Sequence, residues 1–377
     1  MEKADITIIG AGVIGLAVAA ALARQDRALY VLERNASFGQ ETSGRNSEVI
    51  HSGIYYPQNS LKARTCVRGN RLIYELCAKN NIPCEKRGKL IIASEEKELA
   101  KLNELLRNGQ NNDVQGLKII SEKEIKDIEP NVRALAALYS PDTGIVDSHN
   151  LMRYFFQKAK TEGGEFVFEA EVRKIKKQGE GFEVTVCDAD GSDFLFFSRI
   201  LINCAGLSSD IVAGLAGIDT GKENYTLKFC KGQYFRVGAA KSRMITHLVY
   251  PVPDEKHGSL GIHATPDLGK GLRLGPDAEY VERDKADYSV DNSRKEHFWR
   301  AANRFLPFIE ANDLTADTSG IRPKLQGEDE PFRDFVISHE EKKGLTGLIN
   351  LIGIDSPGLT AAAAIAKHVE DMVEDLI

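Results

Sequence analysis

The chain has few of the residues that mark disulfide-rich, membrane-spanning or nucleic-acid-binding proteins. Its six cysteines among 377 residues form no Cys-x-x-Cys pair and have no nearby histidine pattern, which predicts reduced core thiols and no metal site. No apolar run approaches the ~20 residues that a membrane-spanning helix needs. Basic residues number 49 against 55 acidic ones, and the well-mixed net charge of -6 argues against a nucleic-acid surface.

The length and the amino-terminal sequence bound the organisation of the protein. A chain of 377 residues with 42% hydrophobic content can bury a large core and form two structural units from discontinuous segments. The first residues, MEKADITIIG, enter an apolar strand almost at once and leave no room for a signal peptide. We therefore expect a cytoplasmic protein with at most peripheral contact with the inner face of a membrane.

Residues 5–35 carry a dinucleotide-binding pattern. A β-branched run is followed by Gly10-x-Gly12-x-x-Gly15, an alanine-rich helix and a second apolar run that ends at Glu33. The first glycine makes a tight turn, the second lets the backbone approach a pyrophosphate, and the third permits close packing of helix and strand. The acidic residue can bind a ribose diol. The pattern predicts a dinucleotide site but does not separate NAD from FAD, because both contain the same ADP half.

Four later segments resemble a known family. They are TSGRNSEVIHSGIYYPQNSLKARTCVRGN (42–70), TGIVDSHNLM (143–152), YPVPDEKHGSLGIHATPDLGKGLRLGP (250–276) and IGIDSPGLTAAAAIA (352–366). Together with the fingerprint, they resemble the FAD-dependent oxidoreductases that include D-amino-acid oxidase, glycine oxidase and glycerol-3-phosphate dehydrogenase. Within that family they are most similar to the L-2-hydroxyglutarate dehydrogenase branch. The resemblance covers nearly the whole chain.

The resemblance implies an α/β and α+β fold with two discontinuous domains. A Rossmann-like FAD-binding domain is expected from residues 1–86, 145–222 and 317–377. A mostly antiparallel β substrate domain with attached helices is expected from residues 87–144 and 223–316, as a roof over the flavin.

The resemblance also implies the cofactor contacts. In IDSPGL, Ser356 is a plausible helix N-cap and Pro357 a favourable first helical residue, so the start of a helix would face the flavin. The predicted FAD contacts are Gly10, Gly12, Gly15, Glu33, Arg34, Thr42, Ser43, Arg45, Asn46, Ser47, Ser52, Gly53, Val172, Ala205, Gly206, Arg322, Gly353, Ser356, Pro357, Gly358, Leu359 and Thr360. Ser52 and Gly53 are placed nearest the ring.

Substrate binding is expected to depend on an arginine. In this family the arginine of a G-I-R-P element, here Arg322, lies over the flavin and binds the substrate carboxylate through its planar fork. Tyr250, His263 and Lys324 are predicted to complete the substrate site. A second carboxylate, as in 2-hydroxyglutarate, needs a further cation, and the sequence leaves Lys324, Lys231 and Arg45 as candidates.

Two histidines are the candidate catalytic bases. Oxidation of a 2-hydroxy acid needs a group that accepts the hydroxyl proton, and an imidazole does so near neutral pH. His263 is preferred, and His51 in VIHSGIYY is expected to face the flavin, with Gly53 making room. The alternatives left open are that both rings only orient the substrate while water takes the proton, and that His51 is a core residue or carries a covalent flavin link.

The predicted activity is oxidation of an L-2-hydroxy acid, with electrons passed to a quinone or another carrier. The resemblance implies that this acid is 2-hydroxyglutarate. An amino-acid or amine oxidase on the same scaffold is the nearest alternative. A third possibility is a non-catalytic dinucleotide-binding module, which would bind FAD without reducing it. Reduction of the flavin by each candidate substrate distinguishes the three.

Overall fold

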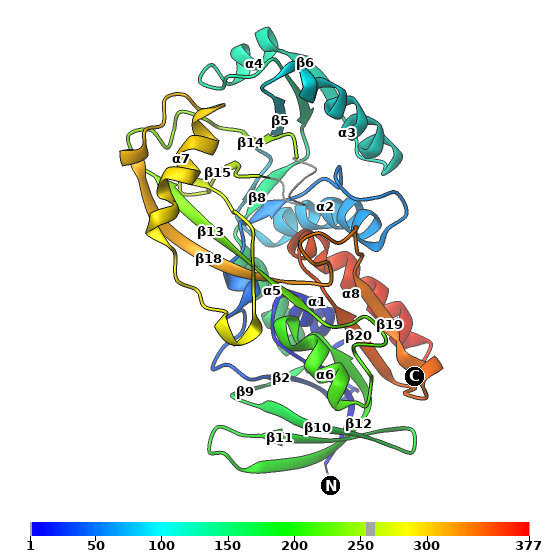
Figure 1. Ribbon diagram of the computed structural model, residues 1–377. Coiled ribbons are helices and arrows are strands. Elements are labelled where there is room, and N and C mark those ends of the chain that lie inside the picture. Colours follow the sequence, from blue (N-terminus) through cyan, green and yellow to red (C-terminus); the bar gives the residue numbers. More distant parts are fainter. Residues whose placement is uncertain (1, 254–260, 377) are drawn as a thin grey trace.

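A computed structural model describes residues 2–253 and 261–376 (Figure 1). It contains two large β-sheets with a group of helices between them, and the expected mixed α/β and α+β architecture is confirmed. Residues 254–260, which belong to the segment 250–276 that carries part of the family resemblance, lie outside the described residues.

The dinucleotide pattern folds as a β–α–β unit. The three elements are β1 (Lys3–Ile9), α1 (Val13–Leu22) and β2 (Leu29–Glu33), and β1 and β2 pair in parallel. Helix α1 is buried on nearly all sides, which explains its uniformly apolar sequence. A parallel pair needs a crossover connection, and α1 provides it.

The first large sheet is partly parallel and partly antiparallel. Its strands, besides β1 and β2, are β9 (Glu165–Phe168), β10 (Glu171–Gln178), β11 (Gly181–Cys187), β12 (Asp193–Asn203), β19 (Val336–His339) and β20 (Leu348–Ile352). The main order is β10-β11-β12-β1-β2-β9, and β20 joins β12 in parallel. The carboxyl ends of β1, β2 and β12 therefore meet at one edge, where an open α/β sheet binds its ligand.

The second large sheet forms the roof. Its strands are β5 (Lys89–Ala93), β6 (Lys118–Ser121), β7 (Ala136–Ser140), β13 (Lys228–Val237), β14 (Leu248–Pro251), β15 (Ala264–Pro266), β16 (Leu272–Leu274), β17 (Glu279–Val281) and β18 (Leu314–Lys324). These strands pair in antiparallel fashion except β5 and β14, which run parallel. The prediction of a mostly antiparallel sheet is confirmed.

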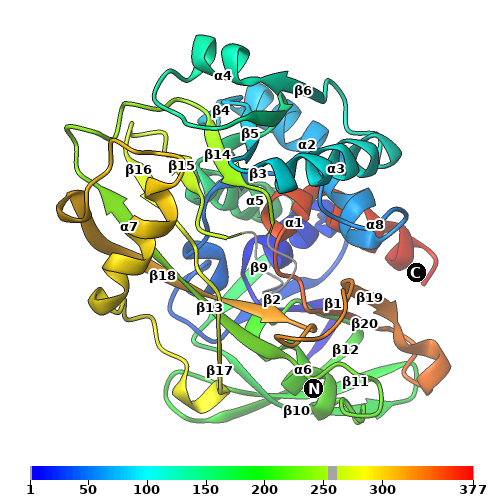
Figure 2. The same ribbon diagram turned by 45° about the horizontal axis from the view of Figure 1, so that its top comes forward.

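A small sheet and the remaining helices connect the two large sheets. The small sheet contains β3 (Val49–Ile50), β4 (Cys84–Glu85) and β8 (Gly144–Val146). The helices are α2 (Leu61–Asn80), α3 (Leu99–Asn111), α4 (Glu122–Ile128), α5 (Ser148–Thr161), α6 (Ser209–Leu215), α7 (Lys295–Asn303) and α8 (Gly358–Glu374). Figure 2 shows α1, α2 and α8 side by side, and α8 packs on both of the others.

Local sequence explains where several helices begin. The Ser60 hydroxyl accepts a hydrogen bond from the Ala63 N–H at the start of α2. Ser121 and Glu124 form a capping box at the start of α4, and the Asp147 carboxylate caps α5. These side chains satisfy backbone donors that would otherwise lack partners.

The strands divide between the predicted domains with two exceptions, β18 and β8. The strands of the first sheet all come from the segments expected to bind FAD, whereas β18 of the second sheet crosses the expected boundary at residue 317. Strand β8 crosses the boundary at residue 145. The domain boundaries themselves stay a prediction.

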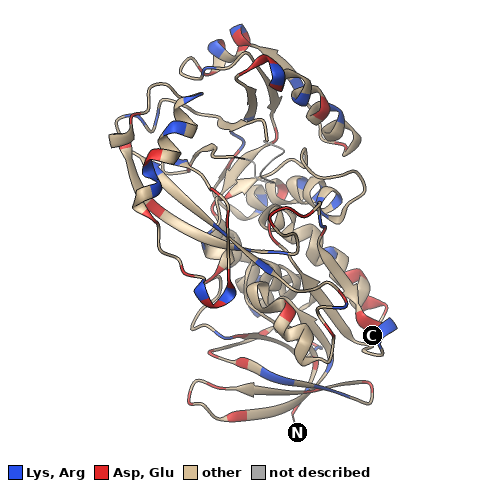
Figure 3. Cartoon of the chain, viewed as in Figure 1, with Lys and Arg blue, Asp and Glu red and all other residues tan. Residues whose placement is uncertain are grey.

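Charged residues of both signs are interspersed over the side of the molecule seen in Figure 3. All six cysteines are free thiols. Within residues 2–253 and 261–376, no helix combines the length and the apolar composition needed to cross a membrane.

Candidate active site

An elongated cavity runs from the edge of the first sheet to the underside of the roof. Its larger part has a volume of about 370 Å³ and its smaller part about 150 Å³. Both parts are lined by Gly12, Thr42, Ser43, Cys204 and Gly206, so they are continuous. The smaller part follows β1 and β2, and the larger part reaches β13, β14 and β18.

The glycines of the fingerprint let the turn after β1 pack closely against α1 and Cys204. Gly10 has φ +103°, and a Cβ atom there would lie 2.5 Å from the Cys204 carbonyl oxygen. A Cβ atom on Gly15 would overlap the Gly10 carbonyl oxygen. The loop after β2 is tied to the same turn, because the Ser43 hydroxyl accepts a hydrogen bond of 2.9 Å from the Val13 N–H. The start of α1 therefore opens into the cavity.

Glu33 lies at the end of β2 in the smaller part and is 8% exposed. Its carboxylate accepts hydrogen bonds of 2.8 Å from the Ala11 N–H and from the Asn35 N–H and amide. Its neighbour Arg34 pairs with Glu41 and donates to the Ser208 hydroxyl at 3.0 Å. Both side chains are thus fixed at the cavity wall.

Most of the predicted contacts line the cavity. In addition to the shared residues, the smaller part is lined by Gly10, Glu33, Arg34, Val172 and Ala205. The larger part is lined by Arg45, Asn46, Ser47, His51, Tyr250, His263, Arg322, Lys324, Ser356, Pro357, Gly358 and Leu359. The predicted residues that do not line it are Gly15, Ser52, Gly53, Gly353 and Thr360, together with the candidate cation Lys231.

Ser52 and Gly53, which were predicted to lie nearest the ring, do not line the cavity. The Ser52 hydroxyl is buried and accepts a hydrogen bond of 3.0 Å from the Ser140 hydroxyl. Gly53 has φ +104°, and a Cβ atom there would meet Val67 of α2 at 2.6 Å. The missing side chain therefore gives room to α2 rather than to a flavin.

Two further residues predicted to contact FAD, Thr360 and Gly353, lie outside the cavity lining. The Thr360 hydroxyl accepts from the His51 N–H at 3.0 Å and donates to the Val49 carbonyl at 3.2 Å. Gly353 faces Leu325, whose side chain would meet an added Cβ atom at 2.6 Å. Both positions connect segments that surround the cavity.

The expected cap of the carboxyl-terminal helix is wrong. Helix α8 begins at Gly358, and Pro357 occupies the N-cap position without a capping side-chain hydrogen bond. The Ser356 hydroxyl instead lies 3.3 Å from Nε2 of His51. Ser356 thus faces the larger part of the cavity and contacts a candidate catalytic residue.

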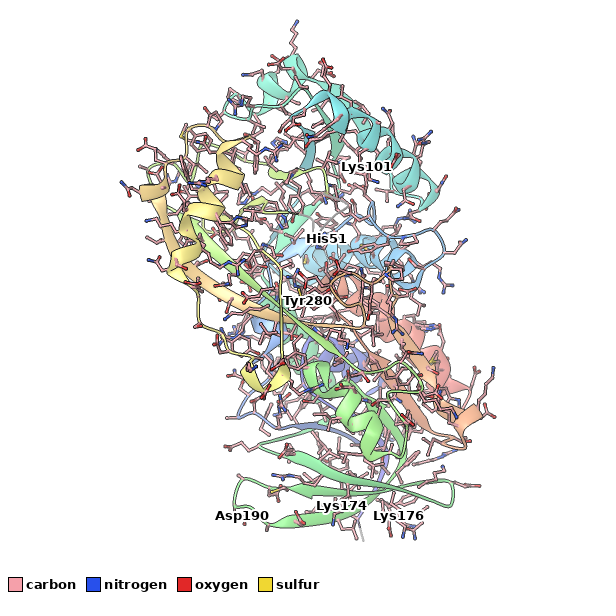
Figure 4. All side chains as sticks on the ribbon, in the orientation of Figure 1. His51, Lys101, Lys174, Lys176, Asp190 and Tyr280 are labelled. Carbon is pink, nitrogen blue, oxygen red and sulfur yellow. The ribbon has the colours of Figure 1, made fainter. Side chains whose placement is uncertain are left out.

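His51 and Tyr280 both line the larger part of the cavity and appear near the middle of the molecule in Figure 4, whereas Lys174 and Lys176 lie on β10. The Nδ1 atom of His51 is buried and has no hydrogen-bond partner among the described residues. Burial, with a smaller contribution from Lys89, lowers the pKa of His51 to about 3. The ring is therefore neutral at pH 7.

His263 is held in a defined orientation on the roof. Its Nδ1 atom lies 3.0 Å from the Gly261 carbonyl oxygen, and its ring stacks on Tyr250 with centroids 3.7 Å apart. Because a carbonyl oxygen only accepts, Nδ1 carries the proton of the neutral ring and Nε2 is left as an acceptor. Burial lowers the pKa of His263 to about 3.

Arg322 is fixed by backbone carbonyl groups. Its Nη2 atom donates to the Asp277 carbonyl at 2.8 Å and to the Lys231 carbonyl at 3.4 Å, and Nε donates to the Cys230 carbonyl at 3.4 Å. These contacts set the plane of the guanidinium and leave Nη1 as its remaining donor edge. Arg322 and His263 line the same part of the cavity.

Several lining residues were not predicted from the sequence. They include Tyr55, Tyr56, Lys62, Tyr280 and Asp355. Tyr55 and Tyr56 stand in the same motif as His51, and Asp355 stands in the motif of Ser356, so proximity to those residues was the available signal. Lys62 also stands in the segment 42–70, but its pairing with Asp355 had no signal, because the two residues are 293 positions apart in the sequence.

Lys89 lies beside the two histidines and was also not predicted. It is 1% exposed, and its ammonium lies 4.7 Å from the ring centroids of both Tyr55 and Tyr250. Burial lowers the pKa of Lys89 to about 7. Its positive charge in turn lowers the pKa of His51 and of His263.

The residues present fit FAD. The cradle formed by the turn from Gly10 to Gly12 depends on glycine, because a Cβ atom on Gly10 would clash with the Cys204 carbonyl oxygen. It lies beside the start of α1, where backbone N–H groups attract a pyrophosphate. Glu33 provides an acceptor for ribose hydroxyls at the end of β2. In the larger part, the orphaned Nδ1 of His51 offers a polar atom to a bound ring. FAD when bound supplies redox chemistry that the amino-acid side chains lack.

Comparison with known proteins gives the same assignment. A model of the DAO family, described as FAD dependent oxidoreductase, matches residues 5–372. The chain is 37% identical over 408 residues to the mitochondrial L-2-hydroxyglutarate dehydrogenase of Arabidopsis thaliana, covering 98% of this chain and 83% of that protein. It is 30% identical over 414 residues to the human mitochondrial L-2-hydroxyglutarate dehydrogenase, covering 98% and 88%.

Solved structures share the fold. FAD-bound L-alpha-glycerophosphate oxidase from Mycoplasma pneumoniae matches with a TM-score of 0.87 and 26% identity, covering 99% of this chain and 95% of that one. Glycine oxidase from Geobacillus kaustophilus matches with a TM-score of 0.78 and 19% identity, covering 100% and 95%.

The comparisons also correct one expectation. A cytoplasmic location was expected, and this expectation is wrong, because the relatives in Arabidopsis thaliana and in human are named as mitochondrial enzymes. The family model, the names of the relatives and the residues that line the cavity all indicate an FAD-dependent oxidoreductase. The chain belongs to the DAO family of FAD dependent oxidoreductases, and its cofactor is FAD.

Proposed function

We propose that the protein oxidises L-2-hydroxyglutarate to the 2-oxo acid. The observation that carries the proposal is the placement of Arg322 and neutral His263 in one cavity, with the guanidinium plane and the imidazole tautomer both fixed by carbonyl groups. The names of the relatives from Arabidopsis thaliana and human support the choice of substrate.

Arg322 binds the carboxylate next to the reacting carbon. Its Nε and Nη2 atoms already donate to carbonyl groups and to the Cys230 sulfur, so the two protons of Nη1 are the donors for the substrate. A guanidinium held in this way fixes the position of the adjacent carbon without reorganising when the substrate arrives.

His263 accepts the hydroxyl proton at Nε2. Its neutral ring at pH 7 has a lone pair on that atom because Nδ1–H is committed to Gly261. An anionic substrate in the same cavity raises the basicity of the ring, since negative charge nearby favours the imidazolium. FAD, when bound, would supply the acceptor for the α-hydrogen and its two electrons, while Nε2 of His263 holds the hydroxyl proton.

His51 acts as an orienting group. Its Nε2 contacts Ser356, its backbone N–H is fixed by Thr360, and its Nδ1 is free to bind the cofactor or substrate. Tyr55 and Tyr56, together with the stacked pair of Tyr250 and His263, exclude water from this end of the cavity.

Anaerobic mixing tests the proposal. The FAD-loaded protein is mixed with L-2-hydroxyglutarate, D-2-hydroxyglutarate or L-glutamate, and the loss of flavin absorbance is followed. We expect rapid bleaching with L-2-hydroxyglutarate alone. Bleaching by L-glutamate and not by the hydroxy acid would establish an amino-acid oxidase instead, and absence of bleaching by all three would contradict the proposal.

The carrier that reoxidises the flavin stays a prediction. A quinone or another carrier is expected to receive the electrons, and the sequence leaves open whether oxygen also reaches the reduced flavin. After anaerobic reduction, the rate of flavin recovery with a soluble quinone is compared with the rate in oxygenated buffer. Faster recovery with oxygen would contradict this expectation.

A further inference from the structure

Cationic side chains outnumber carboxylates in the larger part of the cavity. Among its described lining residues, four side chains are lysine or arginine and two are carboxylates, which leaves a formal surplus of two positive charges. They are Arg45, Lys62, Arg322 and Lys324, against Glu48 and Asp355. A buried surplus of this size destabilises the ligand-free protein, and a ligand with two negative charges would neutralise it.

Lys62 and Asp355 form a buried ion pair at this end of the cavity. Their Nζ and Oδ1 atoms are 2.8 Å apart, and the side chains are 10% and 6% exposed. The Lys62 ammonium also lies 5.0 Å from the centroid of Phe335 and 5.7 Å from that of Phe332. Its position is therefore fixed by one carboxylate and two aromatic rings.

Lys324 lies two residues after Arg322 on β18, so both side chains point to the same face of the strand. Its ammonium has no hydrogen-bond or ion-pair partner in the part of the chain that the structure describes. Burial lowers the pKa of Lys324, and the nearby Asp355 opposes this shift, while Arg322 and Lys62 add to it. Arg322, Lys324 and Lys62 thus lie near a single carboxylate, which is that of Asp355.

The other candidates for a second carboxylate site are less well placed. Lys231 pairs with Asp287 at 2.6 Å and does not line the cavity. Arg45 lines the cavity, but its guanidinium carbon lies 3.9 Å from the Tyr288 ring centroid, and its buried Nε atom has no hydrogen-bond partner among the described residues. We prefer Lys324 because it follows Arg322 on the same face of β18.

We propose that Lys324, together with Lys62 held by Asp355, binds the distal carboxylate of a five-carbon dicarboxylic hydroxy acid. Arg322 binds the carboxylate next to the hydroxyl, and the two lysines select substrates that carry a second one. This assignment rests on the proposed function and specifies which residues separate dicarboxylates from monocarboxylates.

The test compares two substrates that differ only at the distal group. L-2-hydroxypentanoate has a methyl group where L-2-hydroxyglutarate has its second carboxylate. We measure kcat/KM for anaerobic flavin reduction with each substrate and take their ratio. In Lys324→Met the ratio should fall by roughly 10- to 100-fold, because a charge-assisted hydrogen bond to the distal carboxylate is lost. Lys62→Met should lower it in the same direction.

Lys174→Met is the matched control, since it makes the same change at an exposed lysine of β10 outside the cavity. Its ratio should equal that of the unaltered protein. An unchanged ratio in Lys324→Met, or an equal fall in Lys174→Met, would overturn the assignment. Failure of the unaltered protein to be reduced by L-2-hydroxyglutarate would instead contradict the proposed function.

A binding measurement tests the same subsite without catalysis. Glutarate and pentanoate lack the hydroxyl group and cannot react, and each is titrated into the FAD-loaded unaltered protein while the flavin spectrum is followed. Glutarate should bind at least roughly tenfold more tightly, and its advantage should disappear in Lys324→Gln. Equal affinities in the unaltered protein would overturn the distal subsite.

Discussion

The two histidines of the cavity differ in which nitrogen is free. His263 keeps Nε2 as an acceptor because Nδ1 is bound to a carbonyl oxygen, whereas Nε2 of His51 contacts a hydroxyl. We predict that His263→Gln lowers the rate of flavin reduction by L-2-hydroxyglutarate by roughly 10²- to 10⁴-fold, as expected for loss of a general base. FAD content should stay the same, because the ring lies on the roof.

His51→Gln is the comparison for this experiment. It should lower the rate less, since an orienting group is lost while the base remains. Stopped-flow absorbance of the FAD-loaded variants gives both rates. Equal losses in the two variants, or an unchanged rate in His263→Gln, would remove His263 from the role of base.

Lys89 provides a prediction about stability. Its pKa is lowered from 10.5 to about 7 by burial, so between these pH values the unfolded chain binds more protons than the folded one. The free energy of unfolding therefore falls as pH is lowered from 10.5 to 7, by up to about 1.4 kcal/mol per pH unit from this group. Lys89→Met should remove that dependence and raise the stability at pH 7.

Urea unfolding at several pH values between 7 and 10 measures the slope. The exposed Lys174 of β10 offers a control, since Lys174→Met removes a lysine that water already solvates. Equal pH slopes of the free energy of unfolding for Lys89→Met and the unaltered protein would mean that Lys89 has the same pKa in the folded and the unfolded chain.

At the scale of single residues, sequence predicts those that stand in recognisable motifs. Arg322 and His263 were identified in this way, and both line the cavity. Lys62 and Lys89 were not, because a lysine in a helix or strand usually lies at the surface. Their importance comes from partners far away in the chain, such as Asp355, which only the fold brings near.

At the scale of elements, the fingerprint glycines permit a sharp test. A Cβ atom on Gly15 would overlap the Gly10 carbonyl oxygen, so Gly15→Ala should push α1 away from β1 and deform the cradle. We expect FAD affinity to fall by at least roughly tenfold, since misplacing the helix N-terminus weakens its hydrogen bonds to the pyrophosphate. Fluorescence titration of the apoprotein with FAD measures the change.

Gly214→Ala in α6 is the control for Gly15→Ala. An added Cβ atom at Gly214 meets nothing within 4 Å, and alanine favours a helix. FAD affinity should not change in this variant. Unchanged affinity in Gly15→Ala as well would mean that the cradle tolerates the displacement of α1.

Elements with strong local signals were predicted from the sequence, and those defined by tertiary contacts were not. The strand, glycine turn and helix at the amino terminus, and the cap at Ser121, follow from local chemistry. The start of α8 was placed too early, because Ser356 has the composition of a cap but turns its hydroxyl towards His51. The Ser356 hydroxyl could cap its own helix or contact His51, which is 305 residues away in the sequence. Spacing alone cannot decide between these two partners.

At the scale of the whole molecule, the site depends on both large sheets. Strand β18 carries Arg322 and belongs to the roof, and the chain then returns to the first sheet through β19 and β20. His51 comes from the loop after β3, and His263 from the segment before β15. The order of these segments was predictable from the resemblance, whereas the contact between His263 and Tyr250 depends on how β14 and β15 pair.

The burial of His51 and His263 between the two sheets predicts that acid lowers the stability of the protein. His51 and His263 each have a pKa near 3 in the folded protein against 6.5 when solvated, so the unfolded chain binds more protons between these values. The free energy of unfolding should therefore fall as pH drops below 6.5, by up to about 1.4 kcal/mol per pH unit for each histidine. Urea unfolding with excess FAD, followed between pH 6.5 and 4.5, measures this slope. A variant with both His51→Gln and His263→Gln should show a shallower dependence, and identical slopes would mean that the two imidazoles become protonated without unfolding the protein.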